Sequence, residues 1–276
     1  MVTGDPATKA ARAVLMDVLD LLREYGDSVV VAGGWVPSLS PSKGIMPHVG
    51  TADVDLILDY RRIPEQAKPT LSDLLLDRGY RPGSDQFKFR RTVNTETGPI
   101  DVEVDFLTLE PEGNLPGDYY QTIQGVKALK VRGGDLVFEG PITETLEGEL
   151  PDGSKTSLIV RMASSVPFLI LKSLALFDRR ARKDAYDIYY YLKNYPKDLD
   201  ELAKEFQGFM CHKLVLEGLQ RLAMCFSSLN SEGPRFVAEF METEDTEERE
   251  RLQRDAYEHV NDLIEKLGLR RDKSGS

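Results

Sequence analysis

The spacing of apolar residues changes near residue 161, and this change constrains the fold more than any other feature of the chain. Up to residue 160 the apolar residues form short β-branched runs and alternating stretches, interrupted by glycine and proline. From Ser164 onward they recur at the three- and four-residue spacing of helices. Strands followed by helices are typical of an α+β fold. We therefore predict a strand-rich domain over residues 1–160 and an all-helical domain over residues 161–276.

The first domain is expected to contain a small mixed β-sheet with flanking helices. Its predicted helices begin at Asp5-Pro6, ending at Gly26, and at Leu71, ending before Gly79; its predicted strands are 28–32, 53–58, 86–93 and 100–109. After Leu109 the pattern weakens until residue 160. In the second domain helices are predicted over 166–179, 183–193, 199–206 and 213–229, followed by an acidic final helix through residue 267.

Composition excludes several classes of protein. With 41% hydrophobic and 29% charged residues, the chain has the makeup of a folded domain and not of a disordered one. No apolar run approaches the ~20 residues that cross a bilayer, so no membrane association is expected. The first residues lack a basic stretch followed by an apolar one, and the two cysteines cannot form a disulfide framework. A cytoplasmic location is the simplest expectation. The net charge of −11 argues against a broad nucleic-acid-binding surface, although a local basic cleft stays compatible with it.

Three acidic residues form the most informative constellation in the sequence. Asp53 and Asp55 are two positions apart on one predicted strand, so their side chains project from the same face. Asp105, on another predicted strand, comes alongside them if the two strands are neighbours. Carboxylates that converge repel one another unless a cation lies between them, and hard oxygen ligands of this kind hold Mg²⁺. Glu103 alternates in phase with Asp105 and is the rival candidate for the third ligand.

A pair of glycines, Gly33 and Gly34, follows the first predicted strand. Without Cβ atoms the backbone there can approach a phosphate, and the following helical turn presents free N–H groups. A diglycine or an Asp-x-Asp alone is more often structural, but their order along the chain favours phosphoryl or nucleotidyl transfer. His48 lies in the glycine-rich loop before Asp53 and, as a single histidine without a partner, is interpreted as a loop residue.

These residues resemble a known signature. Gly33-Gly34, Thr51-x-Asp53-x-Asp55-Leu56 and Val104-Asp105-Phe106 are similar to the motifs of the DNA polymerase β-like nucleotidyltransferase superfamily. The resemblance implies that Asp53, Asp55 and Asp105 bind two Mg²⁺ ions, and that Asp105 also activates the acceptor hydroxyl. It places Gly33, Gly34 and Thr51 at the nucleotide. The eighteen residues between Gly34 and Asp53 exceed the usual gap, which indicates an insertion within 37–50.

A second block narrows the resemblance. Lys172, Arg179 and Lys183-Asp184-x-x-Asp187-Ile188-Tyr189 are similar to the pattern of the AbiEii/AbiGii abortive-infection nucleotidyltransferase toxins, relatives of the MenT toxins. The resemblance implies that Lys172 contacts a nucleotide phosphate and that Asp184 supports the active site. From the residues alone, Lys172 is equally compatible with a lysine whose ammonium reaches water, and Asp184 with Asp187 is compatible with a solvated helix face.

The sequence thus predicts a Mg²⁺-dependent nucleotidyltransferase of AbiEii toxin type. It would transfer a nucleoside monophosphate from a nucleoside triphosphate to a hydroxyl, on a tRNA 3′ end or a protein side chain, with release of pyrophosphate. A toxin of this type implies a cognate antitoxin as partner. Two alternatives stay open: a small-molecule nucleotidyltransferase of the aminoglycoside or lincosamide kind, and a catalytically inactive nucleotide-binding regulatory module.

Overall fold

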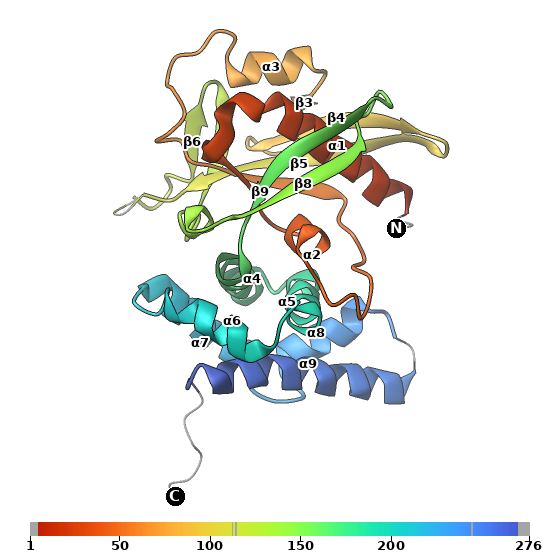
Figure 1. Cartoon of the computed structure of the whole chain (residues 1–276), viewed down its shortest axis with the longest axis vertical. Coiled ribbons are helices and arrows are strands. Elements are labelled where there is room, and N and C mark those ends of the chain that lie inside the picture. The colour runs from red at the N-terminus through yellow and green to blue at the C-terminus, as the bar shows by residue number, and fades with distance from the viewer. Residues whose placement is uncertain (1–4, 112, 114, 244, 270–276) are drawn as a thin grey trace, which may run out of the picture. The chain divides into compact units, whose positions relative to one another are not determined.

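The chain folds into two compact units that together contain one mixed β-sheet and a set of helices, an α+β architecture (Figure 1). The computed structural model describes residues 5–269 except residues 112, 114 and 244. The first unit comprises the described residues of Met1–Leu39 and Val49–Ser164. The second comprises the described residues of Ser40–His48 and Ser165–Ser276, so it takes up a short segment that precedes Asp53 in the sequence.

Within the described part of the first unit, nine strands form one sheet. They are β1 (Val29–Val31), β2 (Asp53–Leu58), β3 (Arg81–Pro82), β4 (Lys88–Thr95), β5 (Gly98–Leu109), β6 (Tyr120–Ile123), β7 (Val126–Val131), β8 (Ile142–Glu149) and β9 (Lys155–Met162). The strand order is β3-β4-β5-β2-β1-β9-β8, and β7 pairs with both β5 and β6. The sheet is mixed, because β2 runs parallel to β5 but antiparallel to β1.

The helices of the first unit are α1 (Pro6–Leu21), η1 (Arg23–Ser28), α2 (Trp35–Leu39), α3 (Leu71–Asp77) and η2 (Leu136–Phe138). Side chains cap the first turns of α1 and α3. The Asp5 carboxylate accepts hydrogen bonds from two backbone N–H groups in the first turn of α1. Thr70 and Asp73 form a reciprocal capping box at the start of α3. Helix α1 packs across β2, β4, β5, β8 and β9 and covers the apolar face of the sheet.

The hairpin formed by β8 and β9 lies in the region where the sequence pattern is weak. Strand β8 alternates between half-buried and exposed residues and has no fully buried position. Few of its residues are apolar, and so the apolar pattern does not reveal it. The turn between the two strands, Pro151-Asp152-Gly153-Ser154, is a recognisable hairpin signal that the apolar pattern alone does not reveal. Strands β6 and β7 are also absent from the sequence-based prediction, which is incomplete over 110–160.

The second unit is helical in its described residues after Ser164. Its helices are α4 (Ser165–Arg179), α5 (Arg182–Asn194), α6 (Leu199–Gln207), α7 (Lys213–Cys225), α8 (Glu232–Phe240) and α9 (Thr246–Lys266). Helix α7 ends earlier than predicted, and α8 is a separate helix that the pattern did not resolve. Gly233 in α8 allows this helix to pack closely against Phe226 at the end of α7, since a Cβ atom at position 233 would lie 2.5 Å from the Phe226 ring. No described helix combines the length and the apolar character needed to cross a membrane.

The short segment Ser40–His48 is fastened to helix α5 by Asn194. The Asn194 side-chain oxygen accepts hydrogen bonds from the backbone N–H groups of Ile45 (3.0 Å) and Met46 (3.2 Å). The Asn194 backbone oxygen accepts another from Lys43 N–H at 2.8 Å. The insertion expected within 37–50 therefore supplies part of the second unit, and the domains are not divided at a single point of the chain.

Candidate functional site

Parallel pairing of β2 with β5 brings four carboxylates onto one face of the sheet. Asp53 is the register partner of Glu103, and Asp55 is the register partner of Asp105. The alternate residues of both strands, among them Val54 and Val104, are fully buried on the opposite face. Adjacent strands are about 4.8 Å apart, so the acidic side chains of the two strands are direct neighbours. Both candidates for the third acid are present, Asp105 beside Asp55 and Glu103 beside Asp53.

A lysine that the sequence analysis did not single out lies among these acids. Lys88, on β4, is the register partner of Asp105 across the antiparallel β4–β5 pair. Its Nζ lies 2.9 Å from Glu103 Oε2 and 3.0 and 3.1 Å from the two carboxylate oxygens of Asp105. Only the pairing of β4 with β5 brings Lys88 to this place, and no short motif in the sequence marks it.

The charges in this group alter one another's protonation. Burial opposes the charge of Lys88, but Glu103 and Asp105 outweigh burial and raise its pKa above the usual range, so the ammonium stays protonated. Burial also raises the pKa of Asp105, an effect that Lys88 offsets only in part and that the neighbouring Asp53 and Glu103 reinforce. The surroundings of Asp105 therefore disfavour its charged form on balance.

Gly33 is in direct contact with Asp55. Its φ is +62°, a left-handed conformation that glycine adopts readily, and a Cβ atom at this position would lie 1.7 Å from Asp55 Oδ2. Gly34 is buried immediately before α2. Two hydrogen bonds hold this turn against β2: Trp35 Nε1–H donates to the backbone oxygen of Asp53 (2.8 Å), and Ala32 N–H donates to that of Asp55 (3.0 Å). The diglycine and the Asp-x-Asp strand thus form one local structure.

Thr51 orients the first acid. Thr51 is buried, and its hydroxyl donates a short hydrogen bond to Asp53 Oδ1. The resemblance places Thr51 at a nucleotide, which stays a prediction. In this structure the Thr51 hydroxyl is hydrogen-bonded to Asp53.

The donor types of this group suit Mg²⁺, because all are carboxylate oxygens. Their present positions do not form a closed set of ligands: among the described His, Cys, Asp and Glu residues, no group of three is placed to hold a metal ion. Two of these acids already have hydrogen-bond donors, since Thr51 donates to Asp53 and Lys88 donates to Asp105. A metal ion at this face would require Asp105 to exchange its lysine partner for the ion.

Lys172 and Asp184, the other two predicted site residues, lie in the second unit and bind each other. Lys172 Nζ on α4 lies 2.9 Å from Asp184 Oδ1 and 2.7 Å from Asp187 Oδ2, both on α5. The three side chains are at most 9% exposed. Arg179 adds a two-pronged contact to Asp184, at 2.7 and 2.8 Å. The aspartates therefore do not form a solvated helix face, and Lys172 does not extend into water.

His48 completes this cluster from the segment Ser40–His48. Its Nε2 lies 3.1 Å from Asp187 Oδ1, and its side chain is 4% exposed. Burial lowers the pKa of His48 more than Asp187 raises it. For Asp187 burial acts in the opposite direction but is outweighed by Lys172, His48 and Lys183, so its pKa lies well below the usual range. His48 does lie in a loop, but the expectation that it has no partner was wrong, because it contacts Asp187, 139 positions away in the sequence.

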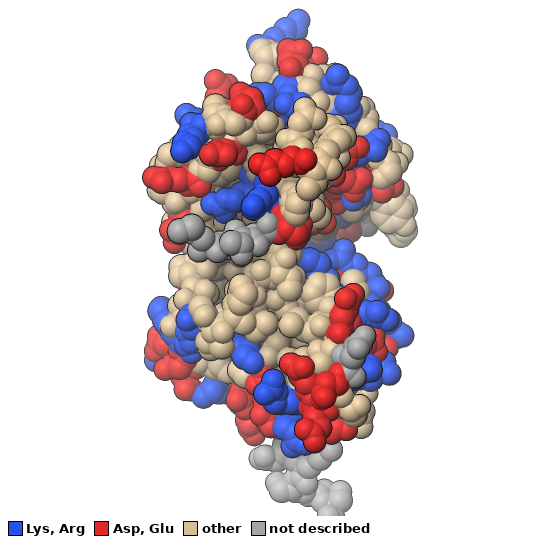
Figure 2. Space-filling model, turned by 90° about the vertical axis from the view of Figure 1, so that its right-hand side faces the viewer, with Lys and Arg blue, Asp and Glu red and all other residues tan. Residues whose placement is uncertain are grey.

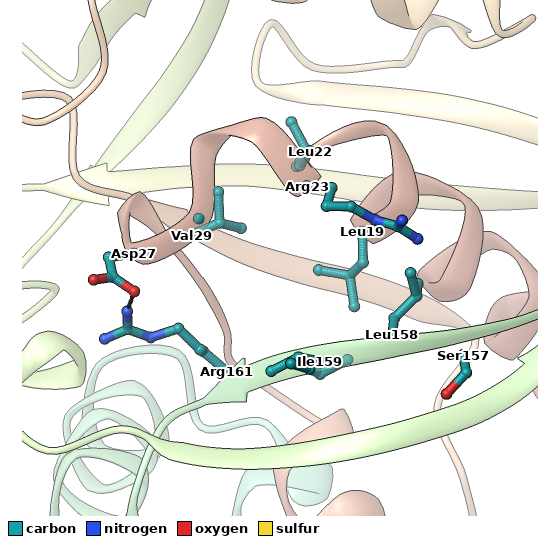
Figure 3. Close-up of a pocket in the computed structure, with 11 residues that line it drawn as sticks. Leu19, Leu22, Arg23, Asp27, Val29, Ser157, Leu158, Ile159 and Arg161 are labelled. Atoms are coloured by element: carbon teal, nitrogen blue, oxygen red, sulfur yellow. Dashed lines mark ion pairs between the residues drawn. The ribbon is translucent and has the colours of Figure 1, made fainter.

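Two cavities of the first unit lie away from the predicted site residues. One, of about 390 Å³, is enclosed by α1, η1 and β9 (Figure 3). Leucines and valines make up much of its wall, and an ion pair between Asp27 and Arg161 closes one end. The other, of about 910 Å³, is lined mainly by polar residues from the end of α1, from η1 and from both ends of α3, among them Arg62 before α3 and Arg78 directly after it. None of the predicted site residues is among the described residues that line either cavity.

Comparison of the chain with protein-family models, with curated proteins and with solved structures gave no match. A function for this α+β protein therefore has to be inferred from its own residues and their geometry.

Proposed function

We propose that the chain is a Mg²⁺-dependent nucleotidyltransferase of AbiEii toxin type. It would transfer a nucleoside monophosphate from a nucleoside triphosphate to a hydroxyl of a tRNA 3′ end or of a protein side chain. The observation that carries the proposal is the register of β2 and β5, which makes Asp55 and Asp105 neighbours, with Asp53 on the same face and Gly33 against Asp55. Lys88 offsets only part of the negative charge of four carboxylates on one sheet face, which supports a ligand-binding role over a purely structural one.

The roles of the residues follow from this arrangement. Asp53, Asp55 and Asp105 would hold Mg²⁺, which supplies neutralisation of the triphosphate charge. The acceptor oxygen forms a bond to the α-phosphorus. The bond between the α-phosphorus and the oxygen that bridges it to the β-phosphorus breaks, and pyrophosphate leaves. Asp105 takes the proton of the acceptor hydroxyl, a task suited to a carboxyl whose pKa is raised by burial. The backbone of Gly33 and Gly34 offers close approach to a phosphate.

The proposed role of Lys172 has a specific requirement. Its ammonium is bound by Asp184 and Asp187, so a nucleotide phosphate would have to replace one of these carboxylates as its partner. Asp184 then supports the site by holding Lys172 and Arg179 in place.

The test is transfer of label from each of the four α-labelled nucleoside triphosphates into the components of a cell lysate, with Mg²⁺. We expect label in RNA or protein with the wild type and none with Asp55→Asn. If no nucleotide labels any acceptor, and Mg²⁺–nucleotide does not bind by calorimetry, the chain is not a nucleotidyltransferase. Binding without transfer would instead favour the inactive regulatory module.

A small-molecule nucleotidyltransferase of the antibiotic-modifying kind is the second candidate. The net charge of −11 favours it, since an RNA acceptor is usually met by a basic surface. On the face drawn in Figure 2, acidic and basic side chains are interspersed over the described residues of both units. Label that enters an aminoglycoside or lincosamide, but neither RNA nor protein, would establish this alternative.

A further inference from the structure

The Lys88 ammonium has more carboxylate oxygens within hydrogen-bond distance than a surface lysine usually has. Its ammonium has three hydrogens, and three carboxylate oxygens lie within 3.1 Å of it, two from Asp105 and one from Glu103. Its side chain is 18% exposed. The Lys88 ammonium thus makes the contacts that a bound cation would make, and it is part of the protein itself.

The backbone of Lys88 is held by Gly83, the residue after β3. Gly83 N–H donates a hydrogen bond to the Lys88 backbone oxygen at 2.8 Å. A Cβ atom at Gly83 would lie 2.7 Å from Lys88 Cβ, so glycine allows the two segments to approach closely. The Phe87 ring lies 5.4 Å from the Lys88 ammonium, a cation–π contact that adds to its placement. The position of the ammonium is therefore built into the fold.

A cation in this position and a metal ion at Asp105 compete with each other. Both Asp105 oxygens accept hydrogen bonds from Lys88, and two positive ions at one carboxylate repel each other strongly in a partly buried site.

We propose that Lys88 is a built-in counter-ion that competes with the divalent cation for Asp105, and thereby sets the metal affinity of the site. The inference rests on the proposed function, since it takes this face as the place of the metal. In the metal-free protein Lys88 neutralises the strand face. When a divalent cation binds, the ammonium leaves Asp105, and Glu103 remains as its partner.

Metal affinity can be measured without activity, by following free Mn²⁺ with electron paramagnetic resonance as it is added to the full chain. Lys88→Met should bind Mn²⁺ at least about tenfold more tightly than the wild type, the change that corresponds to losing one charge-assisted hydrogen-bonded competitor. Lys155→Met removes the same charge from an exposed position at the start of β9 and should leave the affinity unchanged. Equal affinities of Lys88→Met and the wild type would overturn the inference while leaving the metal site in place.

A double-mutant cycle separates direct competition from a general effect of charge. In an Asp105→Asn background the carboxylate for which both cations compete is absent, so Lys88→Met should no longer raise the affinity substantially. An undiminished effect in that background would mean that Lys88 acts only through its charge at a distance, and the competition would be disproved.

A third measurement uses the wild type and does not depend on the folding of a variant. Saturating Mn²⁺ should increase the acetylation of Lys88 by a lysine reagent, quantified by mass spectrometry against Lys155 as internal reference. Unchanged labelling of Lys88 under saturating Mn²⁺ would contradict the inference. If neither the wild type nor Lys88→Met binds Mn²⁺, with or without nucleotide, the proposed function and the inference both fall.

Discussion

Asp55 and Asp105 are register partners on the parallel strands β2 and β5, so two carboxylates that are fifty residues apart in the sequence lie side by side. Parallel pairing places partners on the same face, and Asp53 and Glu103 extend this acidic face by one further pair. The Lys88 ammonium is the cation that meets Asp105 there. This relationship between two strands, and not any single motif, is the basis of the proposed site.

Replacing Asp55 should remove activity without harming the fold. Asp55→Ala deletes a proposed metal ligand, so nucleotidyl transfer should fall by roughly a hundredfold or more. The loss of one of four neighbouring carboxylates should leave the melting temperature of the metal-free protein equal or higher. Stabilisation by added Mg²⁺ and nucleotide should shrink, because a ligand stabilises only as far as it binds the folded state.

The matched control for this change is Asp101→Ala. Asp101 lies on the same strand as Asp105 but is exposed and receives a hydrogen bond from Thr92. Transfer at the wild-type rate by Asp55→Ala, in a preparation that melts normally, would show that the metal site is misplaced.

Gly33→Ala should disable the site through Asp55. A methyl group at position 33 would overlap the Asp55 carboxylate, which must then rotate away. Gly140→Ala is the control, because Gly140 has a similar φ of +66° and no atom within 4 Å of the added methyl. Both substitutions should cost about 1–2 kcal/mol in urea unfolding, owing to the left-handed backbone. Only Gly33→Ala should lose Mn²⁺ binding and transfer; retention of both would mean that Asp55 does not need its present position.

Lys172→Met should destabilise the second unit strongly. The change leaves the buried carboxylates of Asp184 and Asp187 without their shared cation, and breaking a buried ion pair in this way costs about 3–5 kcal/mol. Lys204→Met, which removes an exposed lysine from an ion pair with Glu201, should leave the free energy of unfolding nearly unchanged, because water screens an exposed ion pair. The free energy of unfolding in urea measures both. A stable Lys172→Met protein that has lost nucleotide affinity would show that Lys172 serves the phosphate and is dispensable for the fold.

The stability of the protein should fall as the pH drops below the ordinary pKa of histidine. The folded state lowers the pKa of His48 beneath its usual value of 6.5, so under mildly acidic conditions the unfolded chain binds the proton and the folded one does not. Asp187 favours protonation of His48, whereas Lys172 and Lys183 oppose it together with burial. Stability should therefore rise with pH up to about pH 6.5.

His48→Gln should flatten this dependence between about pH 5 and pH 7, measured by urea unfolding at each pH. If the slope survives in His48→Gln, another group is responsible for it.

The structure shows which parts of this protein depend on local sequence alone. Helix α1 begins at Asp5-Pro6 because the cap and the proline act within the first turn. The alternation from Ile100 to Leu109 gives β5 its buried and acidic faces without reference to any other strand. These features were predicted correctly, because each follows from residues within four positions of one another.

Tertiary structure decided everything that joins distant residues. Three such relationships define the candidate site and the buried cluster of the second unit. They are the parallel register of β2 and β5, the placement of Lys88 opposite Asp105, 17 positions away, and the contact of His48 with Asp187, 139 positions away. The β8–β9 hairpin is of the same kind, since its half-exposed strands are stabilised by each other and by β1 more than by their own pattern. Periodicity tells which face of an element is buried, but the partner on that face is selected by the packing of the whole unit.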